Sequence, residues 1–478
     1  IAESQMMAET DEIVGYSLDP LPLKTYTNIH EGNALRMDWN EVVPAGELDY
    51  IMGNPPFLGY SIQNESQKED MLSVLVDENG KPYKTSGKVD YVSAWYFKSA
   101  MMMQENPEIR AALVSTNSIT QGEQVAGIWA PLMKRFDVHI DFAWRTFIWD
   151  SEANQKAHVH CVIVGFSVGV PSKSPVIYTK EGPTRVSHIN GYLIDADDVF
   201  VENRSIPLCS VPAMTTGNRP ADGGNLIIEA NDYDAFLEAE PDAAKYIKKL
   251  VGSEEFINNK KRYCLWLVGA SPAELRRMPK VMERVTACRE NRLAAPDPGR
   301  QKLADKPALF RETKNPSTYI IVPAVSSEKR SYVPMGFLMD DTIPTNLVTI
   351  IPEASEYHFG ILESSVHMAW MRVVCGRLKS DYRYSKDIVY NNFPWPVNPH
   401  EAMIETISAT AQGILGARAL YPDSSLADLY DEVAMPPELR KAHRANDVAV
   451  LEAYGFPKDA TESEIVARLF KMYQELTK

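Results

Sequence analysis

The chain has 478 residues, and at about 100–200 residues per domain this length predicts roughly three domains. Hydrophobic residues make up 45% and charged residues 24%, a composition typical of globular proteins, and no apolar run approaches the ~20 residues that a membrane helix needs. The net charge of -15 argues against unspecific adhesion to nucleic acid, so any surface that binds nucleic acid has to be local.

The five cysteines lie far apart along the sequence. Their spacing fits neither a zinc site nor a disulfide framework, so we expect reduced, packed thiols, no metal and a cytoplasmic location. The opening residues, IAESQMMAETDE, have no initiator methionine and lack the basic-then-apolar pattern of a secretory signal. We therefore interpret Ile1 as an internal position of a longer protein.

Residues 1–168 alternate between short apolar segments that end in Gly, Asn or Pro and longer segments with helical spacing. This alternation predicts an α/β domain with a largely parallel sheet. Strands are expected at residues 26–35, 48–57, 109–119, 138–147 and 158–167, and helices at 90–104 and 124–136.

The remainder of the chain divides into two further domains. Residues 169–397 contain many short β-like pieces and one charged helical stretch at 272–294, which predicts a mixed α+β domain. The segment 391–399 predicts a linker, because its three prolines block both a ladder and a helix. Residues 398–478 have helical periodicity and predict a small helical domain.

Basic residues are concentrated in part of the second domain. Residues 245–314 hold 17 Lys and Arg against 8 Asp and Glu, so they carry +9 while the rest of the chain carries -24. A basic region in an acidic protein is typical of a surface that contacts phosphates. The alternative is a solvated helix face.

The most informative segment is Asn54-Pro55-Pro56-Phe57, directly after the apolar strand DYIMG. Ligands of α/β sheets bind beyond the carboxyl ends of the strands, so this segment would lie at the rim of a cleft. The Asn54 side-chain oxygen and the Pro55 carbonyl could accept hydrogen bonds from both N–H groups of an exocyclic amine. These hydrogen bonds would localise the lone pair of the amine for attack on a methyl group. Phe57 could stack on a base lifted out of a duplex. The alternative is a plain Pro-rich turn at a strand end.

The sequence resembles the MmeI-like fused restriction-modification enzymes, which belong to the gamma-class DNA amino-methyltransferases that modify adenine N6. The resemblance extends over essentially the whole chain and rests on IHEGNALRMDW (29–39), MGNPPFLG (52–59), VDYVSAWYFKSA (89–100), ALVSTNSITQGEQV (112–125), FAWRTFIWDSEANQKAHVHCVIVGF (142–166) and DYRYSKDIVYNNFPWP (381–396). It implies a partial Rossmann-like class I methyltransferase domain at 1–168, a target recognition domain at 169–397 and a helical domain at 398–478.

The resemblance also implies a function. It is that of a site-specific DNA methyltransferase, which transfers a methyl group from S-adenosylmethionine to adenine N6 of double-stranded DNA in a restriction-modification or related defence system. Asn33 and Ala34 would touch the adenine of the cofactor, with Asp90 and Tyr91 nearby. The alternative for Asn33 is a turn or cap residue.

Two aromatic residues are candidates for the pocket of the target base. By the same resemblance, Phe147 and Trp149 would form its second aromatic wall, and the alternative is core packing at a strand end. The alternating His158 and His160 are interpreted as packing residues, because no third metal ligand is near in sequence.

One part of the family's pattern is missing. The family has a Gly-rich loop and an acidic residue upstream of the Asn-Pro-Pro-Phe segment, and neither occurs before Gly32. We therefore expect a chain that lacks the amino-terminal cofactor-binding half, with binding of S-adenosylmethionine by this piece alone in doubt. One alternative function is a sequence-specific DNA-binding module without turnover. Another is methylation of a protein glutamine or an RNA base, since such enzymes use a similar Asn-Pro-Pro turn.

Residues 375–392 contain the candidates for base recognition. Lys379 and Asp381 are two apart and would face the same way in an extended segment, so they could contact the guanine and cytosine of one G·C pair. The alternative is an exposed salt-bridging pair. Further DNA contacts are expected from Arg377 and Arg383 beside this pair, and contacts to phosphates from Lys260, Lys261, Arg262, Arg276, Arg277, Lys329, Arg330 and Arg372.

Overall fold

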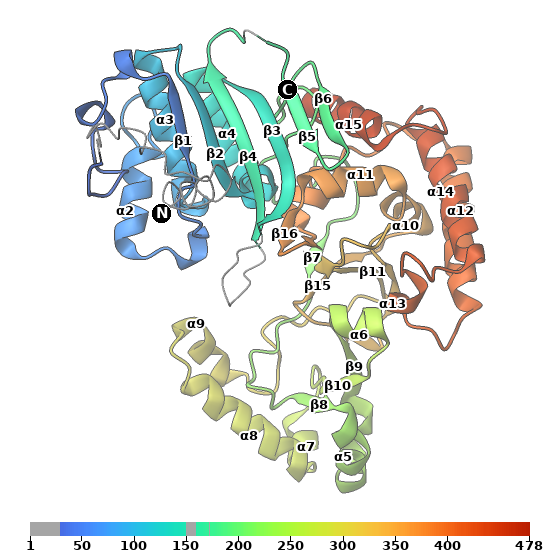
Figure 1. The fold of residues 1–478 in the computed structure, drawn as a ribbon. Helices are drawn as coiled ribbons and strands as arrows, with labels where there is room; N and C mark the ends of the chain where they lie inside the picture. Colours follow the sequence, from blue (N-terminus) through green and yellow to red (C-terminus); the bar gives the residue numbers. More distant parts are fainter. Residues whose placement is uncertain (1–28, 150–158, 172) are drawn as a thin grey trace, which may run out of the picture.

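The computed structural model describes residues 29–149, 159–171 and 173–478 (Figure 1). Its largest sheet has six strands in the order β1-β2-β4-β3-β5-β6. They are β1 (Tyr50–Gly53), β2 (Arg110–Thr116), β3 (Val138–Trp149), β4 (Val159–Val168), β5 (Val176–Thr179) and β6 (Gly182–Arg185). The sheet thus continues beyond the predicted domain limit at residue 168.

The prediction of a largely parallel sheet is wrong for these strands. β1 is parallel to β2 and β3 is parallel to β5, but β4 is antiparallel to both β2 and β3. The reason is that β3 and β4 form a hairpin, which lies between β2 and β5. The carboxyl ends of β1, β2 and β3 still meet at one edge, and in Figure 1 the lobe that contains α7 to α9 lies on the side of this edge.

The strand predicted at 26–35 is also wrong for its described part. Residues 29–35 form no strand; instead the amides of Arg36 and Met37 donate to the carbonyl of Asn33 in a turn. Asparagine favours such turns, and none of the described strands pairs with the segment. Residues 26–28 lie outside the described residues.

Two helices pack against the sheet as the periodicity predicted, α3 (Ser93–Glu105) and α4 (Gly122–Phe136). A third helix, α2 (Glu65–Val74), was not predicted and packs on α3. Tyr96 of α3 is fully buried and its ring stacks on Phe166 of β4 at 5.3 Å, while Trp129 of α4 meets Tyr96 edge to face. These aromatic contacts fix α3 and α4 on the strands whose ends carry the candidate site.

The second region is mixed, as predicted, and contains three smaller sheets in the orders β14-β9-β10-β8, β13-β11-β15-β7 and β12-β17-β16. Its strands are β7 (Thr215–Thr216), β8 (Ile227–Glu229), β9 (Ile247–Val251), β10 (Arg262–Leu265), β11 (Thr318–Pro323), β12 (Val325–Ser326), β13 (Gly336–Met339), β14 (Thr342–Pro344), β15 (Val348–Pro352), β16 (Gly376–Leu378) and β17 (Asp381–Arg383). Its helices are α5 (Tyr233–Ala239), α6 (Ser253–Asn258), α7 (Pro272–Arg276), α8 (Pro279–Leu293), α9 (Pro298–Gln301), α10 (Glu356–Leu362) and α11 (Ser365–Val374). The charged stretch predicted at 272–294 is two helices, because Pro279 begins α8 in its first turn and cannot continue α7.

The helical region ends the chain, as predicted. Its helices are α12 (Glu401–Ala419), α13 (Leu426–Leu429), α14 (Pro437–Ala453) and α15 (Glu462–Thr477). The segment predicted as a linker is instead packed: residues 391–396 are all buried, with Phe393 inaccessible to solvent. The side chain of Asn392 donates to the carbonyls of Glu202 and Asp387 at 2.9 and 2.8 Å, so proline here stiffens a buried connection.

Two expectations concern the whole chain. In the described part of the chain, no helix combines the length and apolar character needed to cross a bilayer. Four cysteines are buried and Cys209 is partly buried, and all five are free thiols.

Candidate active site

The Asn-Pro-Pro-Phe turn, residues 54–57, follows the carboxyl end of β1. Asn54 and Pro56 are exposed, Pro55 is buried and Phe57 is partly buried. Within the described ranges, the Asn54 side chain makes no hydrogen bond to the protein, so its oxygen is available to a ligand. A buried proline beside it restricts the backbone that presents this oxygen.

Asp90 holds the segment that follows the turn. Its side chain is 8% exposed; Oδ1 accepts a hydrogen bond from the amide of Tyr60 at 3.2 Å, and Oδ2 accepts one from the Ser118 hydroxyl. The next amide, that of Tyr91, donates to the carbonyl of Leu58 at 2.9 Å. Asp90 therefore links the residues after the turn to the loop after β2, and it lies behind the turn as a positioning residue.

Asn33 and Tyr91 converge on Asp70, a residue that was not predicted to belong to the site. The Asp70 carboxylate is 3% exposed and accepts from Asn33 Nδ2 at 2.9 Å, from the Tyr91 hydroxyl at 2.8 Å and from Arg36 Nε at 2.6 Å. Burial opposes its ionisation, but these hydrogen bonds outweigh burial and hold the pKa of Asp70 below its usual value. Burial, followed by the nearby Asp70, raises the pKa of Tyr91 to about 12.

The Asn33 side chain is engaged at both ends, because its Oδ1 also accepts from the amide of Leu35 at 2.9 Å. The carbonyl of the partly buried Ala34 accepts from Trp39 Nε1 at 2.8 Å. These contacts correspond to the turn role that was the alternative for Asn33. Asp70 could have been noticed as an acid on the buried face of α2, next to the buried Met71.

The end of β3 contains a bulge. Trp144 lies opposite Ile163 and Phe147 lies opposite Cys161, so β3 has one residue more than β4 between these pairs. Phe147 is partly buried and lines a cleft at this edge of the sheet. The backbone of Trp149 pairs with Val159, and its side chain lies outside the described part of the chain.

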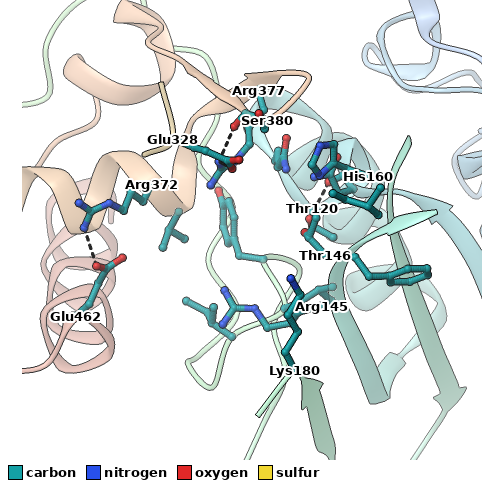
Figure 2. Close-up of a pocket in the computed structure, with 18 residues that line it drawn as sticks. Thr120, Arg145, Thr146, His160, Lys180, Glu328, Arg372, Arg377, Ser380 and Glu462 are labelled. Atoms are coloured by element: carbon teal, nitrogen blue, oxygen red, sulfur yellow. Dashed lines mark hydrogen bonds and ion pairs between the residues drawn. The ribbon is translucent and has the colours of Figure 1, made fainter. Parts of the chain in front are cut away.

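This basic cleft, of about 390 Å³, lies between the first sheet, the β16–β17 hairpin and the helices α11 and α15 (Figure 2). Its charged side chains are Arg145, Lys180, Glu328, Arg372, Arg377 and Glu462. Two of the arginines are neutralised: Arg372 pairs with Glu462 at 2.7 Å and Arg377 pairs with Glu328 at 3.5 Å. Arg145 and Lys180 were not predicted from the sequence. The signal for Arg145 is a basic residue within an aromatic strand segment, FAWRTF.

The β16–β17 hairpin differs from the extended segment that was predicted. Leu378 pairs with Asp381, so Lys379 and Ser380 form a two-residue loop, and Lys379 has a φ of +59°. The argument that Lys379 and Asp381 face the same way along a strand is therefore wrong, because the chain reverses between them. Lys379 is exposed at the hairpin tip and Asp381 is partly buried at the start of β17.

Three family models match consecutive parts of the chain. They are the MmeI DNA-methyltransferase domain at residues 1–179, the MmeI target recognition domain at 195–397 and the MmeI C-terminal domain at 399–478. The chain belongs to the MmeI family. It is 40% identical over 483 residues to DNA methyltransferase A of Bacillus subtilis (strain 168), a match that covers 100% of this chain and 54% of the relative.

A solved structure of the type IIL restriction-modification enzyme MmeI in complex with DNA has the same fold. The TM-score is 0.89 at 41% sequence identity, and the match covers 99% of this chain and 63% of that one. The chain therefore spans between about half and two thirds of the length of these MmeI-family relatives.

Three arginines predicted to contact DNA in or near the β16–β17 hairpin have different surroundings. Arg377 lies 4.4 Å from the ring centroid of Tyr382 and donates to the carbonyl of Ser380 at 2.8 Å, so it braces the hairpin from inside. Arg383 is exposed on β17. Arg330 is partly buried, and burial lowers its pKa while Asp381 raises it.

Ion pairs divide the predicted phosphate contacts in the target recognition domain. Lys260 pairs with Glu254, and Arg262 lies 3.0 Å from Glu255 and 3.3 Å from Glu229. The side chains that are exposed and have no ion pair within the described ranges are those of Lys261, Arg276, Arg277 and Lys329. Charge density in the sequence could not distinguish these two sets, because two of the three acidic partners, Glu254 and Glu255, lie in the same basic region.

The MmeI methyltransferase domain implies S-adenosylmethionine as a cofactor. Among the described strands β1 lies at the edge of its sheet, and the side chains of Tyr50 and Met52 on it are 68% and 80% exposed. The side-chain amide of Asn33 donates a hydrogen bond to Asp70 and accepts one from the backbone amide of Leu35. The described residues thus provide an open edge and do not enclose this cofactor. They also contain no group of three or more His, Cys, Asp or Glu side chains that could hold a metal ion.

Proposed function

We propose that the chain is the catalytic and target-recognising part of a site-specific DNA methyltransferase that modifies adenine N6 in a restriction-modification system. The observation that carries the proposal is the exposed Asn54 amide, free of hydrogen bonds to the described residues, on a Pro-Pro turn at the carboxyl edge of the sheet. Membership of the MmeI family supports it, since the MmeI structure is described as a complex with DNA.

The chemistry explains the residue types in the turn. An exocyclic adenine amine is a weak nucleophile because its lone pair is delocalised into the ring. The Asn54 side-chain oxygen and the Pro55 carbonyl each accept a hydrogen bond from one of its two N–H groups. These two hydrogen bonds localise the lone pair on nitrogen. Phe57 stacks on the extruded base and replaces the stacking that is lost in the duplex. S-adenosylmethionine, when bound, supplies the methyl group.

Target recognition is assigned to the β16–β17 hairpin. Lys379, exposed at its tip, donates to a guanine, and Asp381 and Arg383 on β17 make further base contacts. The exposed Lys261, Arg276, Arg277 and Lys329 contact phosphates, which positions the duplex without reading its sequence. The partly buried Phe147 is assigned to the wall of the base pocket.

The rival function is a DNA-binding module without turnover. The open edge of β1, with its exposed Tyr50 and Met52, favours this alternative because the described residues do not enclose a cofactor. Calorimetric titration of the chain with S-adenosylmethionine separates the two. Saturable binding supports the enzyme, and the absence of binding supports the module.

The experiment that tests the proposed activity identifies the modified base. The chain is incubated with duplex DNA and methyl-labelled S-adenosylmethionine, and the DNA is digested to nucleosides and separated. The proposal predicts label in the deoxyribonucleoside of N6-methyladenine. Label in cytosine, or in RNA or protein added in parallel instead of DNA, contradicts it.

A further inference from the structure

The bulge in β3 sets the direction of the Arg145 side chain. Arg145 and Thr146 lie between the paired residues Trp144 and Phe147, where β3 has its extra residue. A bulge re-aims side chains and is common next to active sites. Both Arg145 and Thr146 line the basic cleft (Figure 2).

Lys180 reaches the same cleft from the neighbouring strand. β5 runs parallel to β3 with Tyr178 opposite Trp144, and the two rings stack at 5.5 Å with an angle of 3° between their planes. Lys180, one residue after β5 ends, is therefore close to Arg145. The stacked rings fix the two strands that carry the two basic residues.

Neither of these two cations is in an ion pair with a described residue. Arg372 and Arg377 are each paired with a glutamate, whereas Arg145 and Lys180 make no hydrogen bond or ion pair with the described residues. Desolvation in the cleft lowers the pKa of Arg145, and Arg377 lowers it further, whereas Glu462 and Glu181, both beyond ion-pair distance, raise it. A guanidinium nevertheless stays protonated in proteins, so the cleft keeps an excess of positive charge that an anion would neutralise.

The walls of the cleft indicate which anion. Asn117 and Gln121 come from the loop after β2, at the sheet edge that also carries the Asn-Pro-Pro-Phe turn, and Ser380 comes from the tip of the β16–β17 hairpin. An anion here lies between the candidate catalytic edge and the candidate base-reading loop. In duplex DNA, the sugar–phosphate backbone connects a base at the catalytic edge to a base pair at the hairpin, and it has one negative charge per phosphate.

We propose that Arg145 and Lys180 bind a backbone phosphate of DNA between the base pair read by the β16–β17 hairpin and the target adenine. Arg145 donates two parallel hydrogen bonds to the phosphate, and Lys180 adds a point charge. The contact fixes the distance along the strand between recognition and chemistry. This inference depends on the proposed function, because it takes DNA as the ligand.

The test measures the salt dependence of duplex binding by the full chain, without cofactor. Each lost phosphate contact makes the slope of log affinity against log salt shallower by about 0.9. We expect that change for Arg145→Ala and for Lys180→Ala, with an equal loss of affinity for all sequences. Arg145→Lys keeps the slope. The matched control is Arg185→Ala, an exposed arginine on β6 outside the cleft, which leaves the slope unchanged.

A second measurement locates the phosphate. Neutral methylphosphonates are placed one position at a time along the target strand; one position weakens binding of the wild type and has no further effect in Arg145→Ala. Wild-type slopes in Arg145→Ala and Lys180→Ala, with DNA still bound, overturn this inference and leave the proposed function intact. Competition by inorganic phosphate as strong as that by duplex DNA also overturns it. A chain that binds no DNA overturns both proposals.

Discussion

The carboxylate of Asp90 accepts a hydrogen bond from the backbone amide of Tyr60 at 3.2 Å. Its second oxygen accepts from Ser118, so one buried side chain ties the segment after the Asn-Pro-Pro-Phe turn to the loop after β2. The geometry of the turn therefore depends on a residue that lies 30 positions beyond Tyr60 in the sequence. Catalysis by positioning is sensitive to such supports, because displacements of about 1 Å can cost about 10²-fold in rate.

Replacing Asp90 by alanine tests this support. We expect Asp90→Ala to lower the single-turnover rate of methyl transfer by about 10²-fold while DNA affinity stays unchanged. Hydrogen exchange of the Tyr60 amide should accelerate, which is a readout independent of activity. Ser118→Ala removes one of the two bonds and should have a smaller effect. An unchanged exchange rate in Asp90→Ala would show that the carboxylate does not hold the loop.

The Asp70 cluster makes stability depend on pH. Because Asp70 has a lowered pKa in the folded chain, its contribution is complete above the ordinary value of 3.8 and is lost as the pH falls through the folded value. Asp70→Asn removes the charge that Arg36, Asn33 and Tyr91 share, and we expect a loss of about 1–3 kcal/mol near neutral pH.

Urea unfolding at a series of pH values measures this contribution. The difference between wild type and Asp70→Asn should stay constant at neutral pH and narrow only below about pH 4. Glu69→Gln, at an exposed position of the same helix, should change stability by less than about 0.5 kcal/mol. If the difference in unfolding free energy between wild type and Asp70→Asn narrowed at a higher pH, the pH dependence would belong to another titratable group.

Arg292 stabilises the lobe around α8 without any counter-ion among the described residues. Its guanidinium is fully buried and donates to five carbonyl oxygens at 2.7–3.1 Å, those of Pro220, Ala221, Leu303, Lys306 and Leu309. Arg292→Met leaves these carbonyls unpaired, and we expect a loss of at least about 3 kcal/mol, since bonds to charged groups contribute about 1.5–3 kcal/mol each.

Limited proteolysis detects that loss within residues 219–314. The lobe should become sensitive in Arg292→Met and stay resistant in Arg289→Met, at an exposed position on the same helix. If both variants were equally resistant to proteolysis, contacts other than those of Arg292 would stabilise the lobe.

Lys379 combines a strained backbone with an exposed side chain. A φ of +59° costs a residue other than glycine about 1 kcal/mol, so Lys379→Gly should leave the hairpin intact or slightly more stable. It should also lose about 1–3 kcal/mol of discrimination at one base pair of the target. Lys329→Ala should weaken binding to all sequences alike. Binding measured across a library of duplexes distinguishes the two, and retained selectivity in Lys379→Gly contradicts the reading role.

Local sequence patterns predicted the elements that carry the site better than their arrangement. The strands β1 to β4 and the helices α3 and α4 follow from apolar periodicity, and the turn at residues 54–57 follows from its prolines. The antiparallel place of β4 could not be predicted, because periodicity identifies a strand without naming its neighbours. The buried segment 391–396 resembled a linker for the same reason: prolines exclude a helix but do not decide burial.

The site residues that escaped prediction act through tertiary contacts. Asp70 lies 37 residues from Asn33, and Arg145 enters the basic cleft because of a bulge that only strand register reveals. Conversely, Lys260 and Arg262 were predicted to contact phosphates from their charge, but acidic neighbours neutralise them. Unpaired charge, and not the number of basic residues, marks the candidate anion sites.

The role of Asn54 in catalysis is tested by the single-turnover rate of methyl transfer in Asn54→Ala, measured together with duplex affinity. If the Asn54 oxygen localises the lone pair of the adenine amine, the rate falls by about 10²–10³-fold and DNA binding is retained. Wild-type rates of N6-methyladenine formation in Asn54→Ala would contradict the account.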